Sequence, residues 1–227
     1  MTRQAFDQEL QRLEDEVLAM GSMVGAALIK SVESLKKRDL AASRALVLAD
    51  REINARRFSL EEDVLTLIAT QQPMAGDMRL LAAVLEILTE LERMGDYAKG
   101  IARINLMIGD KPLVKPIIDL PVMAEKASGM LYDALRAFID RDVELARAIP
   151  QRDDEVDNLY DQIYRELISY ILQDPTTIEQ ANLLMWAAHN LERTADRVTN
   201  LCERVIFMVT GELSELDSDT KGIPSIG

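Results

Sequence analysis

The chain has 227 residues, enough for one large domain or two small domains, each with its own core. Its 48% apolar and 29% charged residues are ordinary for a folded soluble protein, and its aromatic content of only 4% favours helix over sheet. The net charge of −13 makes nucleic-acid phosphates and anionic lipid headgroups unfavourable partners. We therefore expect no nucleic-acid binding and no direct membrane insertion.

The remaining global features point to the cytoplasm. A single cysteine, Cys202, excludes an intramolecular disulfide and fits a reducing compartment. The N-terminal residues MTRQAFDQEL lack the apolar core of a signal peptide. We expect no stretch to reach the roughly 20 apolar residues that a membrane-spanning helix needs.

Helical periodicity begins almost at once. Apolar residues recur at alternating steps of four and three, as in a heptad seam, and predict one long packed helix: Phe6, Leu10, Leu13, Val17, Met20, Val24, Leu28, Val32 and Leu35. Asp39 is placed to cap a second helix that runs to about Gln71. Pro73 and Gly76 then interrupt the pattern, and a third helix follows up to a C-terminal glycine at Gly109.

The pattern then restarts. The segment RDVELARAIPQRDDEVD from Arg141 overlays RDLAASRALVLADREIN from Arg38 at an offset of 103. Pro175 also matches Pro73, at an offset of 102. Similarity in several separate segments indicates that a three-helix unit of about 100 residues has been duplicated.

We therefore predict an all-α fold of six long helices, each of about 24 to 35 residues, in two tandem antiparallel three-helix bundles. The first repeat covers residues 1–111, the second covers 117–211, and 212–227 form a flexible acidic tail. The linker between the repeats lies in the proline-rich stretch GDKPLVKPIIDLP.

The second repeat carries its own helix signals. Asp142 repeats the cap of Asp39, and its helix is expected to run on without a break. Asp174 stands before Pro175, the usual arrangement of a cap and a first helical position, with Thr176 and Glu179 as an alternative capping box. Gly211 ends the last helix.

The sequence Leu-Glu-Arg-x-x-Asp occurs in both repeats. It places Glu92 four residues before Asp96, and Glu192 four residues before Asp196. On a helix this spacing stacks both carboxylates on one face, where two like charges cost a few tenths of a kcal/mol. The chain contains this unfavourable pair twice.

A second set of polar pairs lies on the preceding helix of each repeat. Asp50 and Asn54 occupy the positions that Asp153 and Asp157 occupy in the second repeat. Antiparallel packing can bring the two pairs of a repeat together, and carboxylates that converge in this way need a cation. Oxygen ligands of this kind suit magnesium, manganese, calcium or iron.

Asn54 removes one charge, so we expect the second repeat to bind metal better. The alternative interpretation is a solvated acidic helix face, because 39 acidic residues produce such pairs by chance.

Three further residues are candidates for a functional role. His189 stands three positions before Glu192 and can share a metal site with it, although a lone helical histidine is more often a packing residue. Cys202 is most simply a small buried residue, since it has no catalytic partner. Arg79 can meet a partner's carboxylate or an acidic neighbour in its own chain.

Two stretches, QQPMAGDMRLLAAVLEILTELERMGDYA and NLERTADRVTNLCERVIFMVTGE, resemble the PhoU family of accessory and regulatory proteins of bacterial phosphate uptake. The motifs that carry the resemblance are Q-P-x-x-x-D-x-R-L, the two L-E-R-x-x-D copies and the duplicated frame. The family's metal-binding E/D-x-x-x-D motifs fall on Glu92 with Asp96 and on Glu192 with Asp196. Tyr97 and Arg197 follow these aspartates where many relatives have histidine, and Arg197 would oppose a cation.

The resemblance implies that the protein is a cytoplasmic adaptor and a homodimer. It also implies that the protein is not an enzyme and has no catalytic residue. It would dock onto a phosphate transporter's ATPase and onto a sensor histidine kinase, and would repress the phosphate regulon when phosphate is plentiful. Its metal would be iron, manganese, magnesium or zinc.

Two alternatives stay open. The first is a ferritin-like metal enzyme, which uses Glu-x-x-His pairs in a bundle core, whereas this chain has one histidine and it precedes the glutamate. The second is a passive metal or phosphate buffer.

Overall fold

A computed structural model of the protein describes residues 2–213 and 215–216. Helices alone, with no strand, make up the regular structure of this part of the chain: α1 (Arg3–Lys37), α2 (Leu40–Gln71), α3 (Gly76–Ile108), α4 (Asp119–Asp140), α5 (Val143–Ala148), α6 (Asp153–Gln173) and α7 (Ile178–Thr210). Two short 3-10 turns, η1 (Ile149–Arg152) and η2 (Pro175–Thr177), precede α6 and α7. The all-α prediction is confirmed.

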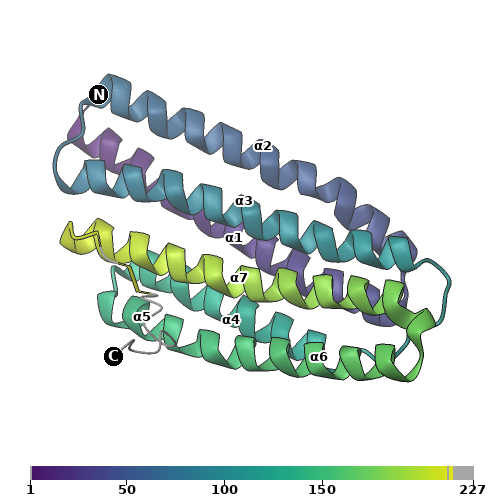
Figure 1. Cartoon of the computed structure of the whole chain (residues 1–227). Helices are drawn as coiled ribbons and strands as arrows, with labels where there is room; N and C mark the ends of the chain where they lie inside the picture. The colour runs from purple at the N-terminus through teal and green to yellow at the C-terminus, as the bar shows by residue number, and fades with distance from the viewer. Residues whose placement is uncertain (1, 214, 217–227) are drawn as a thin grey trace, which may run out of the picture.

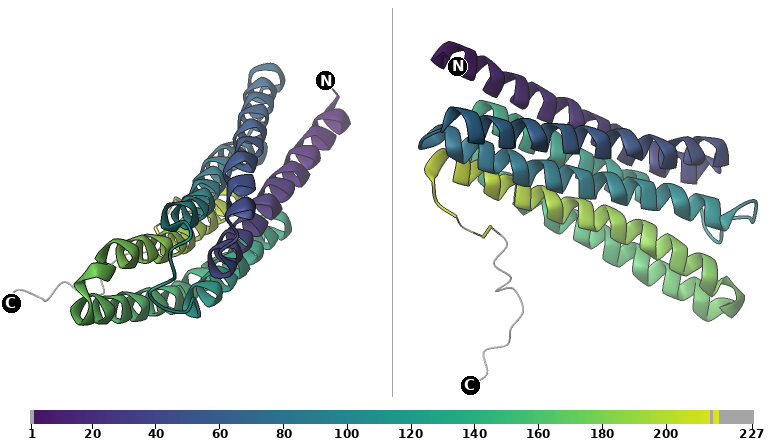
Figure 2. Two further views of the ribbon diagram at one scale, coloured as in Figure 1. Left: turned by 90° about the vertical axis from the view of Figure 1, so that its right-hand side faces the viewer. Right: turned by 90° about the horizontal axis from the view of Figure 1, so that it is seen from above.

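The two repeats form two three-helix bundles that pack against each other. Helices α2, α3, α7 and α6 lie in that order across the molecule, with α1 and α4 behind them (Figure 1). The repeats meet along α3 with α7 and along α1 with α4, while α2 and α6 lie at opposite edges. The left view of Figure 2 shows α1 and α2 at one side of the molecule and α6 and α7 at the other.

The predicted seam of α1 is confirmed, since all nine of its apolar residues are buried. By length and composition α1 is also apolar enough to cross a membrane, which corrects our expectation that no stretch qualifies. Half of that apolar stretch is buried inside the protein, because a helix in contact with three others needs apolar residues on several faces.

The repeated Arg-Asp dipeptide makes the turn after the first helix of each repeat. Arg38 and Arg141 adopt left-handed backbone conformations with φ of 58° and 55°, which end α1 and α4. The next residue then caps the following helix: Asp39 accepts a hydrogen bond from the backbone N–H of Ala42, and Asp142 accepts one in the same way. Both predicted caps are confirmed.

The predicted helix from Asp142 is not continuous. It ends after six residues as α5, passes through η1 and resumes as α6 at Asp153. Pro150 is the reason, because proline lacks a backbone N–H and its ring clashes with the preceding turn. The first repeat has Val47 at the equivalent position, so the overlay of the two repeats predicted an unbroken helix.

The last helix, α7, begins at Ile178, so the predicted first helical position at Pro175 lies instead in the 3-10 turn η2 that precedes it. The carboxylate of Asp174 accepts hydrogen bonds from the backbone N–H and the hydroxyl of Thr176, at 3.0 and 2.7 Å. The alternative capping box with Glu179 does not form, since Thr176 is already bonded to Asp174. Gly109 and Gly211 end α3 and α7 with positive φ, as predicted.

The contact between α3 and α7 contains a polar cluster. Glu90 is buried and lies 3.5 Å from Arg197 and 3.4 Å from the side-chain amide of Asn200, both on α7. This ionic contact joins the two repeats. Most of the predicted acidic tail, residue 214 and residues 217–227, lies outside the described residues.

Candidate functional site

The predicted acidic pairs meet where the second and third helices of each repeat pack side by side. In the first repeat a lysine, Lys99, joins the two pairs. Its ammonium donates hydrogen bonds to Asp50 of α2, at 2.7 Å, and to Asp96 of α3, at 2.9 Å. Asn54 also donates to Asp50, at 3.0 Å. Asp50 and Asp96 of the two pairs therefore meet in the first repeat, but an internal cation already lies between them.

Glu92, the fourth member of the first cluster, lies 3.6 Å from Arg57 of α2. Burial and the neighbouring Asp96 raise the pKa of Glu92, while Arg57 opposes this effect. Burial by itself lowers the pKa of Lys99, but the hydrogen bonds to Asp50 and Asp96 outweigh burial and raise it. The first cluster thus has two cations of its own, and it fits a metal ion poorly.

The second cluster has a different charge balance. Burial raises the pKa of Glu192 to about 7, and the charges of Asp196 and Asp157 add to the effect. Arg193 opposes it from the same helix, and lies 3.8 Å from Asp196. The fourth carboxylate, Asp153, begins α6 one helical turn before Asp157. Burial is the larger cause of the shift, and the two neighbouring carboxylates further disfavour a negative charge on Glu192.

The reason for this difference lies at two positions. At the offsets that relate the repeats, Thr199 replaces Lys99 and Tyr160 replaces Arg57. Neither replacement carries a positive charge. Arg197, expected to oppose a cation here, lies 3.5 Å from Glu90 on α3, so its guanidinium is engaged at the interface between the repeats.

His189 lies beside the second cluster. Its Nδ1 is 3.1 Å from Oε2 of Glu192, a contact that becomes an ion pair only when the histidine is protonated. The same Oε2 is buried and accepts no hydrogen bond from the described residues. A buried carboxylate oxygen in this condition is chemically suited to a metal ion, so the second cluster fits one in its donor chemistry.

The side chains are not arranged as a complete coordination sphere. Among residues 2–213 and 215–216, no three histidine, cysteine, aspartate or glutamate side chains converge closely enough to hold a metal ion. Asp96 and Asp196 are also substantially exposed, at 48% and 36% of their side-chain surface. The clusters therefore lie on helix surfaces, unlike the buried core site of a ferritin-like enzyme.

Arg79 and Cys202 have structural surroundings that explain them. Arg79 donates from Nε to the backbone carbonyl of Met208, at 3.3 Å, in the last turn of α7. This hydrogen bond gives Arg79 a role within its own chain. Binding of Arg79 to a partner protein stays a prediction. Cys202 is fully buried, and burial raises the pKa of its thiol to about 12, as expected of a packing residue.

The sequence analysis did not predict that Lys99 and Arg57 contact the first cluster, although the spacing of Lys99 indicates a contact with Asp96. Lys99 stands three residues after Asp96, a spacing that places opposite charges on one helix face. Arg57 carried no comparable signal, because its contact with Glu92 depends on how α2 and α3 pack.

Comparison with known proteins agrees with this architecture. A family profile described as the PhoU domain matches twice, over residues 17–104 and 120–205, once in each repeat. A protein of Clostridium acetobutylicum named phosphate-specific transport system accessory protein PhoU homolog is 35% identical over 96% of this chain and 100% of its own length. A protein of the same name from Deinococcus radiodurans is 37% identical over 92% of this chain and 98% of its own length.

Two solved structures are similar in fold. The crystal structure of PhoU from Pseudomonas aeruginosa has a TM-score of 0.86 and 30% identity, and the match covers 91% of this chain and 100% of that one. The phosphate transport system regulatory protein PhoU from Streptococcus pneumoniae has a TM-score of 0.85 and 30% identity over 92% and 99% of the two chains. With the profile in both repeats and relatives matched over nearly their full length, this chain belongs to the PhoU family.

Proposed function

We propose that this protein is a cytoplasmic accessory protein of phosphate uptake. As an adaptor, it docks onto the ATPase of a phosphate transporter and onto a sensor histidine kinase, and it represses the phosphate regulon when phosphate is plentiful. The observation that carries the proposal is family membership over nearly the whole chain, with relatives named as accessory proteins of phosphate-specific transport.

The architecture suits an adaptor. Helices of up to 35 residues, packed as two joined bundles, present long and rigid faces to partner proteins. Docking needs no chemistry of its own, and we assign no catalytic residue. We also propose a homodimer, which would present each docking face twice.

Co-purification tests the adaptor role. The protein, expressed with the transporter ATPase and the sensor kinase of its own host, should retain both partners on an affinity column. A host strain that lacks the protein should express its phosphate-responsive genes even in high phosphate, and the intact gene should restore repression. Normal repression in the deletion strain would contradict the proposal.

We further propose that a metal ion, when bound, gathers Glu192, Asp196 and Asp157 of the second cluster as ligands, with Asp153 beside them, although these side chains do not converge on one point in the described structure. Iron, manganese and magnesium fit these oxygen donors best, and zinc is a weaker match because it prefers nitrogen and sulfur. The support is the burial of Glu192 beside Asp196 and Asp157, which raises its pKa to about 7, and the lack of a hydrogen bond to its buried Oε2 among the described residues. The first cluster, in contrast, should remain metal-free because Lys99 supplies its cation.

Elemental analysis of protein purified without tag or chelator tests this assignment. We expect about one metal ion per chain. The double variant Glu192→Gln with Asp196→Asn should lose it, whereas the matched variant Glu92→Gln with Asp96→Asn should keep it. Metal lost equally from both variants would show that the repeats do not differ, and metal-free wild-type protein would show that the pairs are surface charge.

A further inference from the structure

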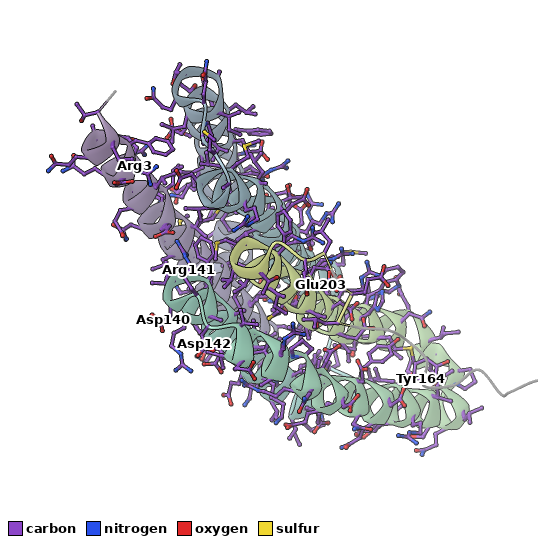
Figure 3. The ribbon with its side chains drawn as sticks, turned by 90° about the vertical axis from the view of Figure 1, so that its left-hand side faces the viewer. Arg3, Asp140, Arg141, Asp142, Tyr164 and Glu203 are labelled. Atoms are coloured by element: carbon purple, nitrogen blue, oxygen red, sulfur yellow. The ribbon has the colours of Figure 1, made fainter. Side chains whose placement is uncertain are left out.

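A hollow of about 290 Å³ opens between α6 and α7 beside the second cluster. Its lining residues are mostly aromatic: Tyr160, Tyr164, Asn182, Met185, Trp186 and His189. Trp186 is the only tryptophan of the chain and is 59% exposed, and Tyr164 is 45% exposed. Figure 3 shows Tyr164 at the end of the view opposite Arg3, on the green helices of the second repeat.

The rings form a connected wall. The ring of His189 lies 6.1 Å from that of Tyr160 and 5.9 Å from that of Trp186, which meets it edge-on. The rings of Tyr160 and Tyr164 are 6.4 Å apart. Side chains from two helices thus leave a hollow lined by ring surfaces, which is open to solvent.

The fold does not require aromatic side chains here. At the equivalent positions of the first repeat the chain has Arg57 for Tyr160, Glu61 for Tyr164 and Glu86 for Trp186. Arg57 and Glu61 form an ordinary ion pair there, at 2.8 Å. The same helix pair therefore packs with charged residues at these places. The exposed rings of the second repeat call for another explanation, such as a binding partner.

The surroundings of the hollow are negatively charged. Glu192 lies against His189 at 3.1 Å, and the charges of Glu192 and Asp161 both raise the pKa of Tyr160, after burial as the largest cause. Neither lysine nor arginine is among the described residues that line the hollow. Ring faces next to carboxylates attract a cation, because the quadrupole of each ring presents a negative face.

We propose that this hollow binds an arginine side chain presented by a protein partner. The planar guanidinium can stack flat on an exposed ring of the hollow, where the negative face of the ring attracts its charge. A lysine ammonium has no planar face to stack on a ring and holds its water more strongly. The inference deepens the proposed adaptor role, since it names one docking surface and the residue type that this surface recognises.

Trp186 allows the recognition to be measured directly. Acetyl-arginine amide should quench its fluorescence with saturation, and acetyl-citrulline amide, which is uncharged but of similar shape, should bind roughly 3- to 30-fold more weakly. The variant Tyr164→Ala should lose the same preference. Equal binding of the two compounds would overturn the proposal.

Phe58 provides a matched control. It is 62% exposed on α2, but Arg57 of its own chain already lies over its ring at 5.4 Å. The variant Phe58→Ala should therefore bind acetyl-arginine amide as the wild type does. A loss as large as that of Tyr164→Ala would mean that the hollow is not the binding site.

Co-purification separates this inference from the proposed function. If wild-type protein retains the ATPase or the kinase, then Trp186→Glu should release at least one of them while Phe58→Ala retains both. Retention of both partners by Trp186→Glu would overturn the docking surface and leave the adaptor role intact. If wild-type protein retains neither partner, the adaptor role fails, and the fluorescence titration still decides whether the hollow selects arginine.

A second copy of the chain is the competing occupant. Light scattering of wild type and Trp186→Glu at equal concentration should give the same mass. A lower mass for the variant would assign the hollow to self-association and would overturn the proposal of a separate partner.

Discussion

Two cations account for the contrast between the acidic clusters at the scale of single residues. Lys99 hydrogen-bonds to Asp50 and Asp96, and Arg57 lies near Glu92, so the carboxylates of the first repeat are balanced from within. The second repeat has Thr199 and Tyr160 in place of these cations, and burial, together with the charges of Asp196 and Asp157, raises the pKa of Glu192 to about 7. Similar motifs therefore have different electrostatics.

The raised pKa of Glu192 predicts how the stability of the fold depends on pH. Because the folded-state pKa of about 7 exceeds the ordinary 4.5, the folded protein binds the proton more tightly than the unfolded chain does. Stability of the metal-free protein should therefore fall as the pH rises from about 4.5 to about 7, and the full penalty applies above that range. The carboxyl group of Glu192 faces His189, Arg193 and Asp196 on α7 and Asp157 on α6.

The variant Glu192→Gln removes the penalty. In chelator-treated protein it should increase the free energy of unfolding by about 1–2 kcal/mol at pH 8 and have little effect at pH 5. Urea denaturation at both pH values measures this. A variant that is destabilised at pH 8 would show that ionised Glu192 is stabilised by partners and not strained.

At the scale of helices, the two aspartate caps, Asp39 and Asp142, are the best predicted features. The residue in the left-handed conformation and the aspartate cap occur in both repeats with matching hydrogen bonds, because capping depends only on neighbours within a few residues. Pro150 breaks the following helix for an equally local reason. Position-by-position comparison with the first repeat, which has no proline there, does not predict this break.

Loss of a cap should have a similar cost in both repeats. The variants Asp39→Ala and Asp142→Ala should each lower the free energy of unfolding by about 1 kcal/mol in urea denaturation. Asp140, two residues before Asp142 at the exposed C-terminal end of α4 (Figure 3), provides the control. Asp140→Ala should be neutral or slightly stabilising, since a negative charge is unfavourable at a helix C-terminus. Equal losses at positions 140 and 142 would argue against capping.

For the whole molecule, the contacts between the repeats predict cooperative unfolding. Repeat one and repeat two share the interfaces of α3 with α7 and of α1 with α4, including the buried Glu90 and its partner Arg197. The repeats should therefore unfold together, although each looks like a separate bundle in the sequence.

The position of the only tryptophan allows a direct test. Val64 is fully buried on α2, which packs on α1 and α3 of the first repeat, whereas Trp186 lies in the second. Val64→Ala should cost about 1–3 kcal/mol, and the fluorescence and circular dichroism midpoints in urea should shift together. A shift in circular dichroism alone would mean that the repeats unfold independently.

The sequence by itself determined the helical class, the duplication, the helix caps and the family, because all of these depend on local patterns or on similarity along the chain. It also placed the carboxylate pairs of each repeat near one another, since antiparallel helices joined by a tight turn have few other arrangements. Only the tertiary structure decided that Lys99 lies between Asp50 and Asp96, that Arg197 turns to Glu90, and that rings from α6 and α7 enclose a hollow. These features depend on which faces of different helices meet, and long-range packing sets that geometry.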